Sequence, residues 1–495
     1  MKRIVRLYAV MAPCAIGASL LAAQTVTTLY SFCDQKDCVN DFNPNALVQA
    51  TNGNLYGTTV GAQGARTQDG TGTVFKITPN GTFKTLYVFC SQAHCPDGRY
   101  PNSLVLASNS DLYGTTQNGG AHGAGTIFKI TPSGALTTVY NFCHQVQSGV
   151  CTDGRTPMAG LVQAASGDLY GTTENGGLYN SGTIFKITPS RTFTTLYSFC
   201  AQTGCPDGAA PTAGLVQAGN GDLYGTTIAG GAISTMDYGG GTIFKITPSG
   251  AFTSLYSFCA QTGCPDGATP MAGLVQATDS DFYGTTQNGG AGGGNYGTIF
   301  KISPAGTFTR LYSFCLDLWP CSDGALPQAP VVQATDGDFY GTTSNGAHGS
   351  GTLFKIDHSG ALLTLYSFCT PVEGCPNGGA VPVAGLMQAT NGSLYGTSES
   401  GGAYNGGTIF ELSVGLGAFV KTLPTSGKPG ETVTILGSDL TGATNVMFNG
   451  TASVFNIVSA REITTAVPTG ATTGKVEVVT PLGTLSSNVS FEVVP

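Results

Sequence analysis

Charged residues are scarce in this sequence. They make up only 10% of 495 residues, and 20 Lys and Arg stand against 28 Asp and Glu, which gives a formal net charge of −8. Proteins that bind nucleic acid need clustered cations to neutralise phosphates, and the sequence contains no basic stripe. We therefore expect no nucleic-acid partner.

Helical periodicity is also missing. Outside the N-terminus, no window repeats apolar residues with the 3.6-residue period of an amphipathic helix. The 73 glycines instead indicate many turns, and β-branched and aromatic residues fill the short runs between them. The composition predicts an all-β protein.

Histidine is scarce too, and no catalytic arrangement is recognisable. The five histidines are scattered through different repeat positions and pair with no recurring Ser or Cys nucleophile: His94, His122, His144, His348 and His358. The sequence therefore predicts no catalytic residue, no cofactor and no metal ligand. A Ser/His/Asp triad remains an open alternative, because its members meet only in space.

Long apolar runs are absent except at the N-terminus. There Lys2, Arg3 and Arg6 precede an apolar run over residues 7–23, which is the order of a secretory signal peptide. A membrane anchor is the alternative, but the run is short for one. We expect residues 1–23 to be removed, leaving no transmembrane anchor, a net charge of −11 (17 basic against 28 acidic residues) and an extracellular or cell-surface location, with the periplasm as the alternative.

What the sequence has in abundance is a repeat. A core of the form LYGTT occurs seven times, spaced 54 to 59 residues apart, and a second core, GT-(Ile/Val/Leu)-F, follows each copy. Such periodicity indicates supersecondary units that bury their apolar faces only against their neighbours. The tyrosines of the first core are Tyr56, Tyr113, Tyr170, Tyr224, Tyr283, Tyr340 and Tyr395.

Each repeat reads as four short strands separated by Asn, Asp and Gly turns. In the first copy these are residues 46–50, 54–59, 72–78 and 85–90. Seven four-stranded sheets in a ring make a seven-bladed β-propeller, which protects its sheet edges by radial repetition; a linear solenoid is the alternative. Because the last copy ends at 407–413 without a fourth strand, we expect residues 27–33 to complete it and close a propeller domain over residues 24–413.

The cysteines follow the repeat. Fourteen of the 15 form seven close pairs, and the odd one, Cys14, lies in the expected signal peptide. Disulfides in an oxidising compartment explain this count, whereas structural zinc needs four ligands and no histidine recurs beside the pairs. The expected bridges are Cys33–Cys38, Cys90–Cys95, Cys143–Cys151, Cys200–Cys205, Cys259–Cys264, Cys315–Cys321 and Cys369–Cys375.

The pattern changes near the C-terminus. Residues 427–494 contain no LYGTT and no cysteine, and short alternating strands are broken by Gly and Pro. This pattern is typical of a small immunoglobulin-like β-sandwich, which we assign to residues 414–495.

Both parts resemble known families. The repeat LYGTTxxGGxxGxGTIFKITPxGxxTTLYSF is similar to that of the choice-of-anchor tandem repeat GloVer-containing proteins, over about residues 25–413. That resemblance implies a bacterial surface protein without an established activity. The tail resembles an IPT/TIG domain at residues 430–437, 446–451 and 463–474, which implies a spacer or interaction module.

An Asp-Gly pair recurs after the second cysteine. The carboxylates of Asp97, Asp153, Asp207, Asp266 and Asp323 could ring the channel and hold a cation, because Ca²⁺ takes several oxygen ligands. The alternative is a turn in which Asp bonds local backbone N–H groups. Recurrence at one repeat position favours the turn.

Candidate ligand contacts are aromatic residues that do not repeat. Strand direction places the Cys loops and the Gly-rich loops on one face of the ring, and long, variable loops often carry function. Their rings could stack on a polysaccharide or pack against a protein partner, or they could simply pack the loops together. A hydrolase or lyase site at the channel mouth and a purely structural surface role are the alternatives. The residues are Tyr179, Tyr238, Tyr296, Trp319 and Tyr404.

Overall fold

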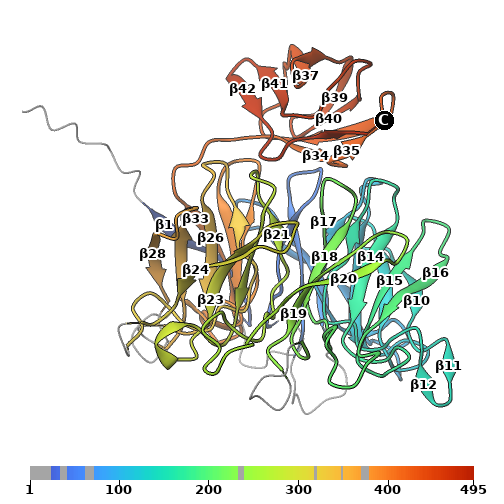
Figure 1. Ribbon diagram of the computed structural model, residues 1–495. Helices are drawn as coiled ribbons and strands as arrows, with labels where there is room; N and C mark the ends of the chain where they lie inside the picture. The colour runs from blue at the N-terminus through green and yellow to red at the C-terminus, as the bar shows by residue number, and fades with distance from the viewer. Residues whose placement is uncertain are drawn as a thin grey trace, which may run out of the picture.

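The computed structural model describes residues 24–33, 42–61, 72–231, 239–316, 320–346, 349–368 and 378–494. Within these ranges the chain is β-structure and turns, apart from one short 3₁₀ turn at Ala291–Gly293. Seven four-stranded antiparallel blades form a propeller, and a smaller sandwich follows at the C-terminus (Figure 1). This confirms the predicted fold class. The expected signal peptide, residues 1–23, lies outside the described residues.

Blade three shows the order of strands in a repeat. It runs β13 (Val162–Gln163), β14 (Leu169–Thr173), β15 (Thr183–Ile187) and β16 (Phe193–Ser198), each paired antiparallel with the next. The innermost strand follows the Cys loop. In blade one the first three strands are shorter than expected, whereas the fourth, Phe83–Val88, has the expected length but begins and ends two residues earlier.

The other blades repeat this arrangement. From the axis outward their strands are, in blade one, β2 (Val48–Gln49), β3 (Leu55–Thr59), β4 (Thr73–Ile77) and β5 (Phe83–Val88); in blade two, β7 (Val105–Leu106), β8 (Leu112–Asn118), β9 (Thr126–Ile130) and β10 (Leu136–Asn141); in blade four, β17 (Val216–Gln217), β18 (Leu223–Thr227), β19 (Thr242–Ile246) and β20 (Phe252–Ser257); in blade five, β21 (Val275–Gln276), β22 (Phe282–Thr286), β23 (Thr298–Ile302) and β24 (Phe308–Ser313); in blade six, β25 (Val332–Gln333), β26 (Phe339–Thr343), β27 (Thr352–Ile356) and β28 (Leu362–Ser367); and in blade seven, β30 (Met387–Gln388), β31 (Leu394–Ser398), β33 (Thr408–Ser413) and β1 (Thr25–Ser31). Short additional strands are β6 (Arg99–Pro101), β11 (Val146–Gln147), β12 (Val150–Cys151), β29 (Gly379–Ala380) and β32 (Ser400–Gly401).

Packing explains why LYGTT repeats. A Cβ on Gly171 would lie 2.6 Å from Cζ of Phe185, so the ring of the GTIF phenylalanine requires glycine beneath it. The hydroxyl of Thr172 donates to the carbonyl oxygen of Ala213 in the next blade at 3.0 Å. Thr173 instead bonds within its own blade, 2.8 Å from the Thr183 hydroxyl. One threonine therefore joins neighbouring blades and the other joins adjacent strands.

Stacked aromatic rings close the outer part of four blade boundaries. Tyr197 of blade three stacks on Phe252 of blade four, with centroids 4.0 Å apart and planes 7° from parallel. Phe199 turns edge-on to the same ring at 5.7 Å and is fully buried. Stacked and edge-to-face pairs are both favourable arrangements for aromatic rings, so at these boundaries the rings of the TLYSF motif hold one blade to the next.

The N-terminal strand completes the last blade. β1 pairs antiparallel with β33, from Thr25 opposite Ser413 to Ser31 opposite Thr408. The observed strand begins and ends two residues earlier than the expected 27–33, and Cys33 has a left-handed φ of 63° where the chain enters its loop. Blade seven also contacts blade one, because the backbone N–H of Thr390 donates to Oε1 of Gln49 at 3.0 Å.

Ring closure can be tested with Phe32, which follows β1. It is fully buried against Phe75 and Phe83 of blade one, just as Phe199 is buried at an internal boundary. We expect Phe32→Ala and Phe199→Ala to lower the free energy of unfolding by similar amounts, about 3–5 kcal/mol each. In a linear array, Phe32 would lie at an exposed end of the chain of blades. Phe32→Ala would then change the urea unfolding midpoint far less than Phe199→Ala.

The C-terminal domain is a two-sheet sandwich. One sheet has the order β34 (Lys421–Leu423), β36 (Thr432–Leu436), β40 (Glu462–Ala466), β39 (Phe455–Ser459), and the other β38 (Thr451–Ala452), β37 (Asn445–Phe448), β41 (Val476–Thr480), β42 (Gly483–Ser486). A parallel pair joins β35 (Ser426–Gly427) to β43 (Glu492–Val493). Its core contains Ile435, Phe448 and Phe491.

The sandwich packs directly on the end of the propeller where short turns join the first strand of a blade to the second and the third to the fourth (Figure 1). Leu436 joins a hydrophobic cluster that contains Ala50 of blade one, and the Ser438 hydroxyl lies 3.2 Å from that of Thr390 in blade seven. A Cβ on Gly53 would meet Cδ of Arg461 at 2.1 Å. Apolar contact, hydrogen bonding and close backbone approach together hold the sandwich against the propeller.

A lysine lies at this junction, and none of the described carboxylates forms an ion pair with it. Nζ of Lys421 donates to the carbonyl oxygen of Gln388 in blade seven at 2.5 Å and lies 5.5 Å from the Phe419 ring centroid. Burial of the ammonium group lowers the pKa of Lys421 to about 8, because a low-dielectric environment disfavours the charged form.

This lowered pKa predicts a specific pH dependence. Below pH 8 the lysine is protonated in both the folded and the unfolded chain, so this group does not make the free energy of unfolding depend on pH. Between about pH 8 and 10.5 the unfolded chain binds a proton that the folded chain does not, and stability rises with pH. The rise should be on the order of 3 kcal/mol.

Urea unfolding at pH 7 to 10 measures this effect. We expect Lys421→Met to remove the rise, whereas Lys428→Met, at an exposed lysine of the same domain, should retain it. Identical pH profiles for wild type and Lys421→Met would show that the ammonium group is hydrated rather than buried.

Candidate ligand-binding face

The two ends of the blades differ. Tight turns connect the first to the second and the third to the fourth strands at the end where the sandwich packs, and we call this end the turn face. The Gly-rich loops and the Cys loops lie at the opposite end, below the propeller in Figure 1, and we call this end the long-loop face. The structure therefore separates long and short connections as the sequence predicts.

Disulfides close the described Cys loops. Five local bridges are formed, Cys90–Cys95, Cys143–Cys151, Cys200–Cys205, Cys259–Cys264 and Cys315–Cys321. Cys33 is also disulfide-bonded, but Cys38, Cys369 and Cys375 lie outside the described residues. The bridges at Cys33–Cys38 and Cys369–Cys375 remain predictions.

The recurring aspartates build these loops. The Asp207 carboxylate accepts hydrogen bonds from the Tyr197 hydroxyl and the Cys200 backbone N–H, both at 2.9 Å. Burial, together with the bond to Asp207, raises the pKa of Tyr197 above its ordinary value. Asp97, Asp153, Asp266 and Asp323 make the same type of tyrosine contact, which supports a structural role in turns rather than a cation ring.

The lysines of the FKI motif form ion pairs at the turn face. Lys129 lies 3.0 Å from Asp111, and Lys301 lies 3.0 Å from Asp281. Lys355 lies between Asp336 and Asp338 at 2.9 and 2.6 Å. Each lysine meets its aspartate because the second and third strands of a blade are adjacent. Each pair is partly exposed, so it adds little to stability.

The five aromatic candidates divide into three groups. Tyr179 and Tyr404 are 49% and 53% exposed in Gly-rich loops of the long-loop face. Tyr296 is half-buried and packs against the Cys315–Cys321 bridge and Leu326, so its ring contributes to loop packing. Tyr238 and Trp319 lie outside the described residues.

Two histidines meet on this face. The rings of His122 and His144 lie 5.9 Å apart, although the residues come from a Gly-rich loop and a Cys loop and share no sequence signal. No three His, Cys, Asp or Glu side chains gather as a possible metal site in the described part of the chain. His358 lies at the turn face instead, 2.8 Å from the Tyr283 hydroxyl.

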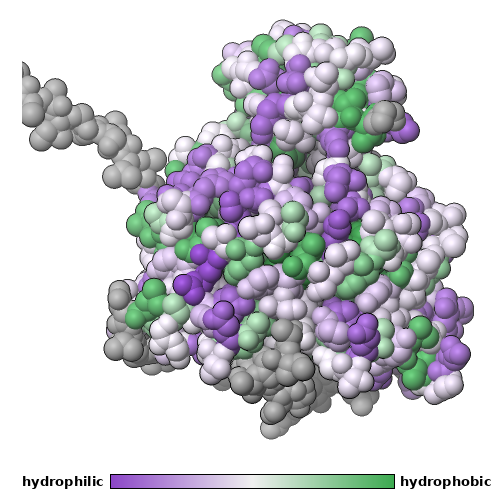
Figure 2. Space-filling model, viewed as in Figure 1, coloured by the Kyte–Doolittle hydropathy of each residue, from purple (hydrophilic) through white to green (hydrophobic). Residues whose placement is uncertain are grey.

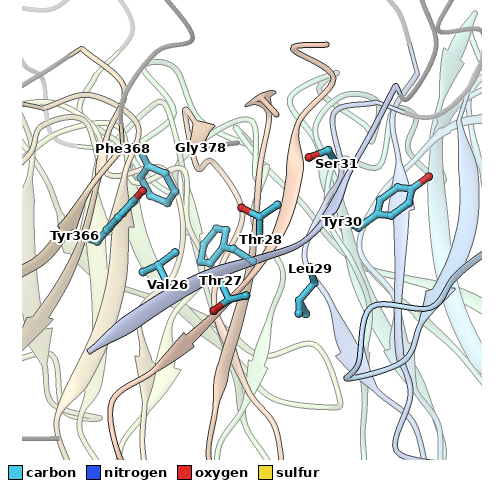
Figure 3. A pocket seen from close by; sticks show the side chains of 11 residues that line it. Val26, Thr27, Thr28, Leu29, Tyr30, Ser31, Tyr366, Phe368 and Gly378 are labelled. Carbon is cyan, nitrogen blue, oxygen red and sulfur yellow. The ribbon is translucent and has the colours of Figure 1, made fainter. Parts of the chain in front are cut away.

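A groove opens between blades six and seven. Its walls include Val26 of β1 and Tyr366 and Phe368 of blade six (Figure 3). Val26 takes the position that Phe252 holds opposite Tyr197, since both residues pair with the residue that follows the FKI lysine or its Glu411 counterpart. Valine therefore offers Tyr366 no ring to stack on at the wall of the groove.

The described residues on the face shown in Figure 2 form no large apolar patch. Hydrophobic and hydrophilic residues alternate over the propeller and the sandwich in Figure 2. Exposed large apolar side chains are instead single residues or adjacent pairs in separate segments, such as Leu178 and Tyr179, or Leu316. This distribution does not indicate an extended protein interface.

The fold defines a repeat propeller with an appended immunoglobulin-like domain. The Gloeobacter/Verrucomicrobia repeat matches residues 19–236, 203–410 and 319–453, and this chain belongs to that family. An IPT/TIG domain matches residues 419–493. Both resemblances inferred from the sequence motifs are confirmed.

Similar solved structures include two propeller proteins. A putative gluconolactonase is 10% identical, with 80% of this chain and 94% of that chain covered and a TM-score of 0.38. A luciferin-regenerating enzyme is 10% identical, with 80% and 98% covered and a TM-score of 0.39. These similarities are too low to transfer an activity. No curated protein matches the chain, and no described helix is long and apolar enough to cross a membrane.

Peptide mapping without reduction tests the cysteine arrangement. We expect seven local bridges in the chain without residues 1–23, including Cys33–Cys38 and Cys369–Cys375, and no free thiol, because each short loop brings its two sulfurs together. A bridge between different repeats, or a persistent free thiol in the mature chain, would contradict this arrangement.

Proposed function

We propose that this chain is an exported, non-enzymatic binding protein whose long-loop face holds a polysaccharide. The observation that carries the proposal is the position of the sandwich. It packs over the turn face through Leu436, Ser438 and Lys421, which leaves the long-loop face as the open end of the propeller.

The exposed groups on this face suit a sugar chain. Tyr179 and Tyr404 present about half of their surface to solvent, and a tyrosine combines an apolar ring face with a polar hydroxyl. Asn180, Ser181 and Asn405 stand beside them and supply amide and hydroxyl groups. Because the aromatic residues come from separate loops, they favour an extended ligand contacted at intervals.

A protein partner is the alternative occupant. The central part of a protein–protein interface is usually a continuous apolar patch, whereas the exposed apolar residues of this face come from separate loops. Export is supported by the five described disulfides, since such bridges persist in oxidising compartments.

Retention on polysaccharides tests the proposal. The mature chain is first screened on immobilised cellulose, xylan, chitin, pectin and peptidoglycan. Its affinity for each polysaccharide that retains it is then measured. We expect Tyr179→Ala and Tyr404→Ala each to weaken binding five- to thirtyfold, on the order of 1–2 kcal/mol per stacking ring.

Two variants provide controls. Leu363 is 56% exposed on β28 at the outside of blade six, so Leu363→Ala removes a similar exposed apolar group away from the face. Ser249 lies in a turn of the opposite face, so Ser249→Ala changes a residue away from the proposed binding surface. Equal losses from all four variants, or the absence of retention on any polysaccharide, would reject the proposal, and chemical degradation of the retained polymer would indicate the hydrolase or lyase alternative.

A further inference from the structure

A second candidate site lies on the opposite side of the propeller from the long-loop face. A cavity of about 270 Å³ opens between the turns of blades two and three, and its walls include Tyr113, Lys129, Gly167 and Arg191. Ligand cavities span roughly 300–1,000 Å³, so this cavity has room for one small molecule only.

The repeat is broken at this cavity. Of the seven LYGTT tyrosines, the other six are at most 2% exposed, whereas Tyr113 is only partly buried. Its hydroxyl has no hydrogen-bond partner among the residues that the structure describes. The cavity therefore exposes a polar group and part of an aromatic ring that other blades cover.

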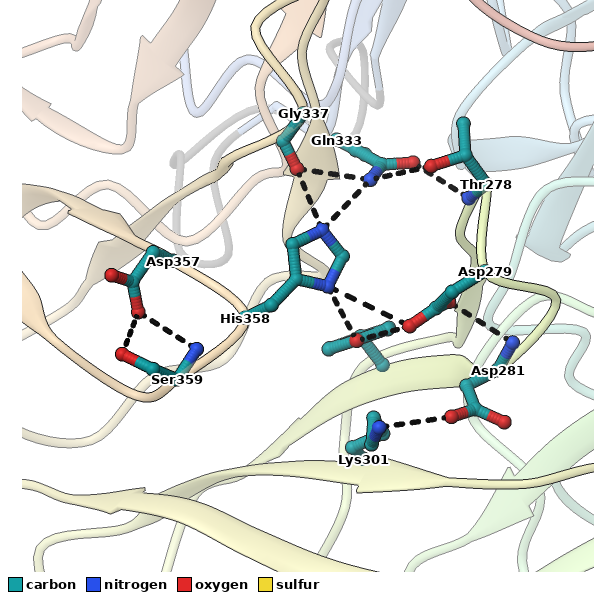
Figure 4. A network of polar contacts seen from close by, with 10 residues as sticks. Thr278, Asp279, Asp281, Lys301, Gln333, Gly337, Asp357, His358 and Ser359 are labelled. Atoms are coloured by element: carbon teal, nitrogen blue, oxygen red, sulfur yellow. Dashed lines mark hydrogen bonds and ion pairs between the residues drawn. The ribbon is translucent and has the colours of Figure 1, made fainter.

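The boundary between blades five and six shows what fits in the equivalent space. There His358 occupies the turn position of Pro189, with Nδ1 2.8 Å from the Tyr283 hydroxyl and Nε2 3.1 Å from the Gly337 carbonyl oxygen (Figure 4). Gln333 approaches the same ring at 3.5 Å. A five-membered ring with polar atoms on two sides thus fills the site.

Blades two and three present the same groups without that ring. Tyr113, Gly167 and Gln163 hold the positions of Tyr283, Gly337 and Gln333 in the repeat, and all three line the cavity. Pro189 offers no polar group to bond them. A bound ring compound with hydroxyl groups could make the contacts that His358 makes elsewhere.

Arg191 adds a charge at this site. Its φ is 66°, a left-handed conformation that other repeats give to glycine at Gly81, Gly134, Gly250, Gly306 and Gly360. Strained backbone of this kind often marks functional positions. The guanidinium has no hydrogen-bond or ion-pair partner among the described side chains. The hydrogen bond and charge of Asp111 raise the pKa of Lys129, and the nearby Arg191 opposes this rise only weakly.

The charges around the cavity favour a monoanion. Lys129 is neutralised by Asp111 at 3.0 Å, and the neighbouring Asp168 is paired with Lys186 at 3.8 Å. Arg191 therefore remains as one uncompensated positive charge. A planar guanidinium matches the two oxygens of a carboxylate.

We propose that this cavity binds a small hydroxylated ring compound with one carboxylate, which is the chemistry of a uronic acid. The Tyr113 ring packs against the sugar face, Gly167 and the Tyr113 hydroxyl bond its hydroxyl groups, and Arg191 holds the carboxylate. The site is independent of the polysaccharide face proposed above.

Calorimetric titration of the mature chain with D-galacturonate tests this site. We expect galacturonate to bind at least tenfold more tightly than galactose, and acetate not to bind detectably, because recognition needs both the ring and the carboxylate. Arg191→Gly, which restores the residue of the other repeats, should weaken galacturonate binding at least tenfold without lowering the melting temperature. Arg191→Lys should retain part of the affinity.

Controls distinguish this site from the long-loop face. Tyr179→Ala should bind galacturonate like the wild type, whereas Tyr113→Phe should lose several-fold in affinity. Unchanged binding in Arg191→Gly, equal affinity for galactose, or no binding of galacturonate to the wild type would each overturn the proposal.

Discussion

One buried hydroxyl at six of the seven blade boundaries is the interaction on which the ring depends. The first threonine of LYGTT donates across the boundary to a carbonyl oxygen of the next blade, as Thr115 does to Ala159 at 2.7 Å and Thr226 to Ala272 at 3.1 Å. An unmade bond would leave a buried polar atom at a cost of about 1–3 kcal/mol. Because every sheet buries its faces only against its neighbours, this bond recurs around most of the ring, with an aromatic stack outside it at four boundaries.

The boundary between blades six and seven departs most from this pattern. The Thr342 hydroxyl has no hydrogen-bond partner among the described residues, and Val26 replaces the ring that would stack on Tyr366. This is also where the chain closes with a strand from its N-terminus. The closing blade is therefore held by its β1–β33 pairing and by contacts with blade one, such as Thr397 to the Pro44 carbonyl oxygen at 3.1 Å.

Residues that recur in this protein build its blades, and residues that do not recur mark the candidate sites. The Asp of the Cys loops bonds a tyrosine in five repeats, and five FKI lysines pair with an Asp near the start of the second strand. Among the described residues, Tyr179, Tyr404 and Arg191 have no such recurring partners, and they lie exposed at the two ends of the propeller. The sandwich covers part of one end, so the two candidate sites face different surroundings.

The amino-acid sequence by itself determined the architecture, because a repeated strand pattern can bury its faces in few ways. Strand order, the closing role of the N-terminal strand and the local cysteine bridges follow from spacing within about 57 residues. Only the tertiary structure decided which exposed residues meet. The space over Tyr113, the unpaired Arg191, the packing of Tyr296 on a disulfide and the docking of Lys421 on Gln388 depend on contacts between different repeats or domains. Local sequence cannot specify these contacts, because each depends on where a neighbouring blade or domain places its side chains.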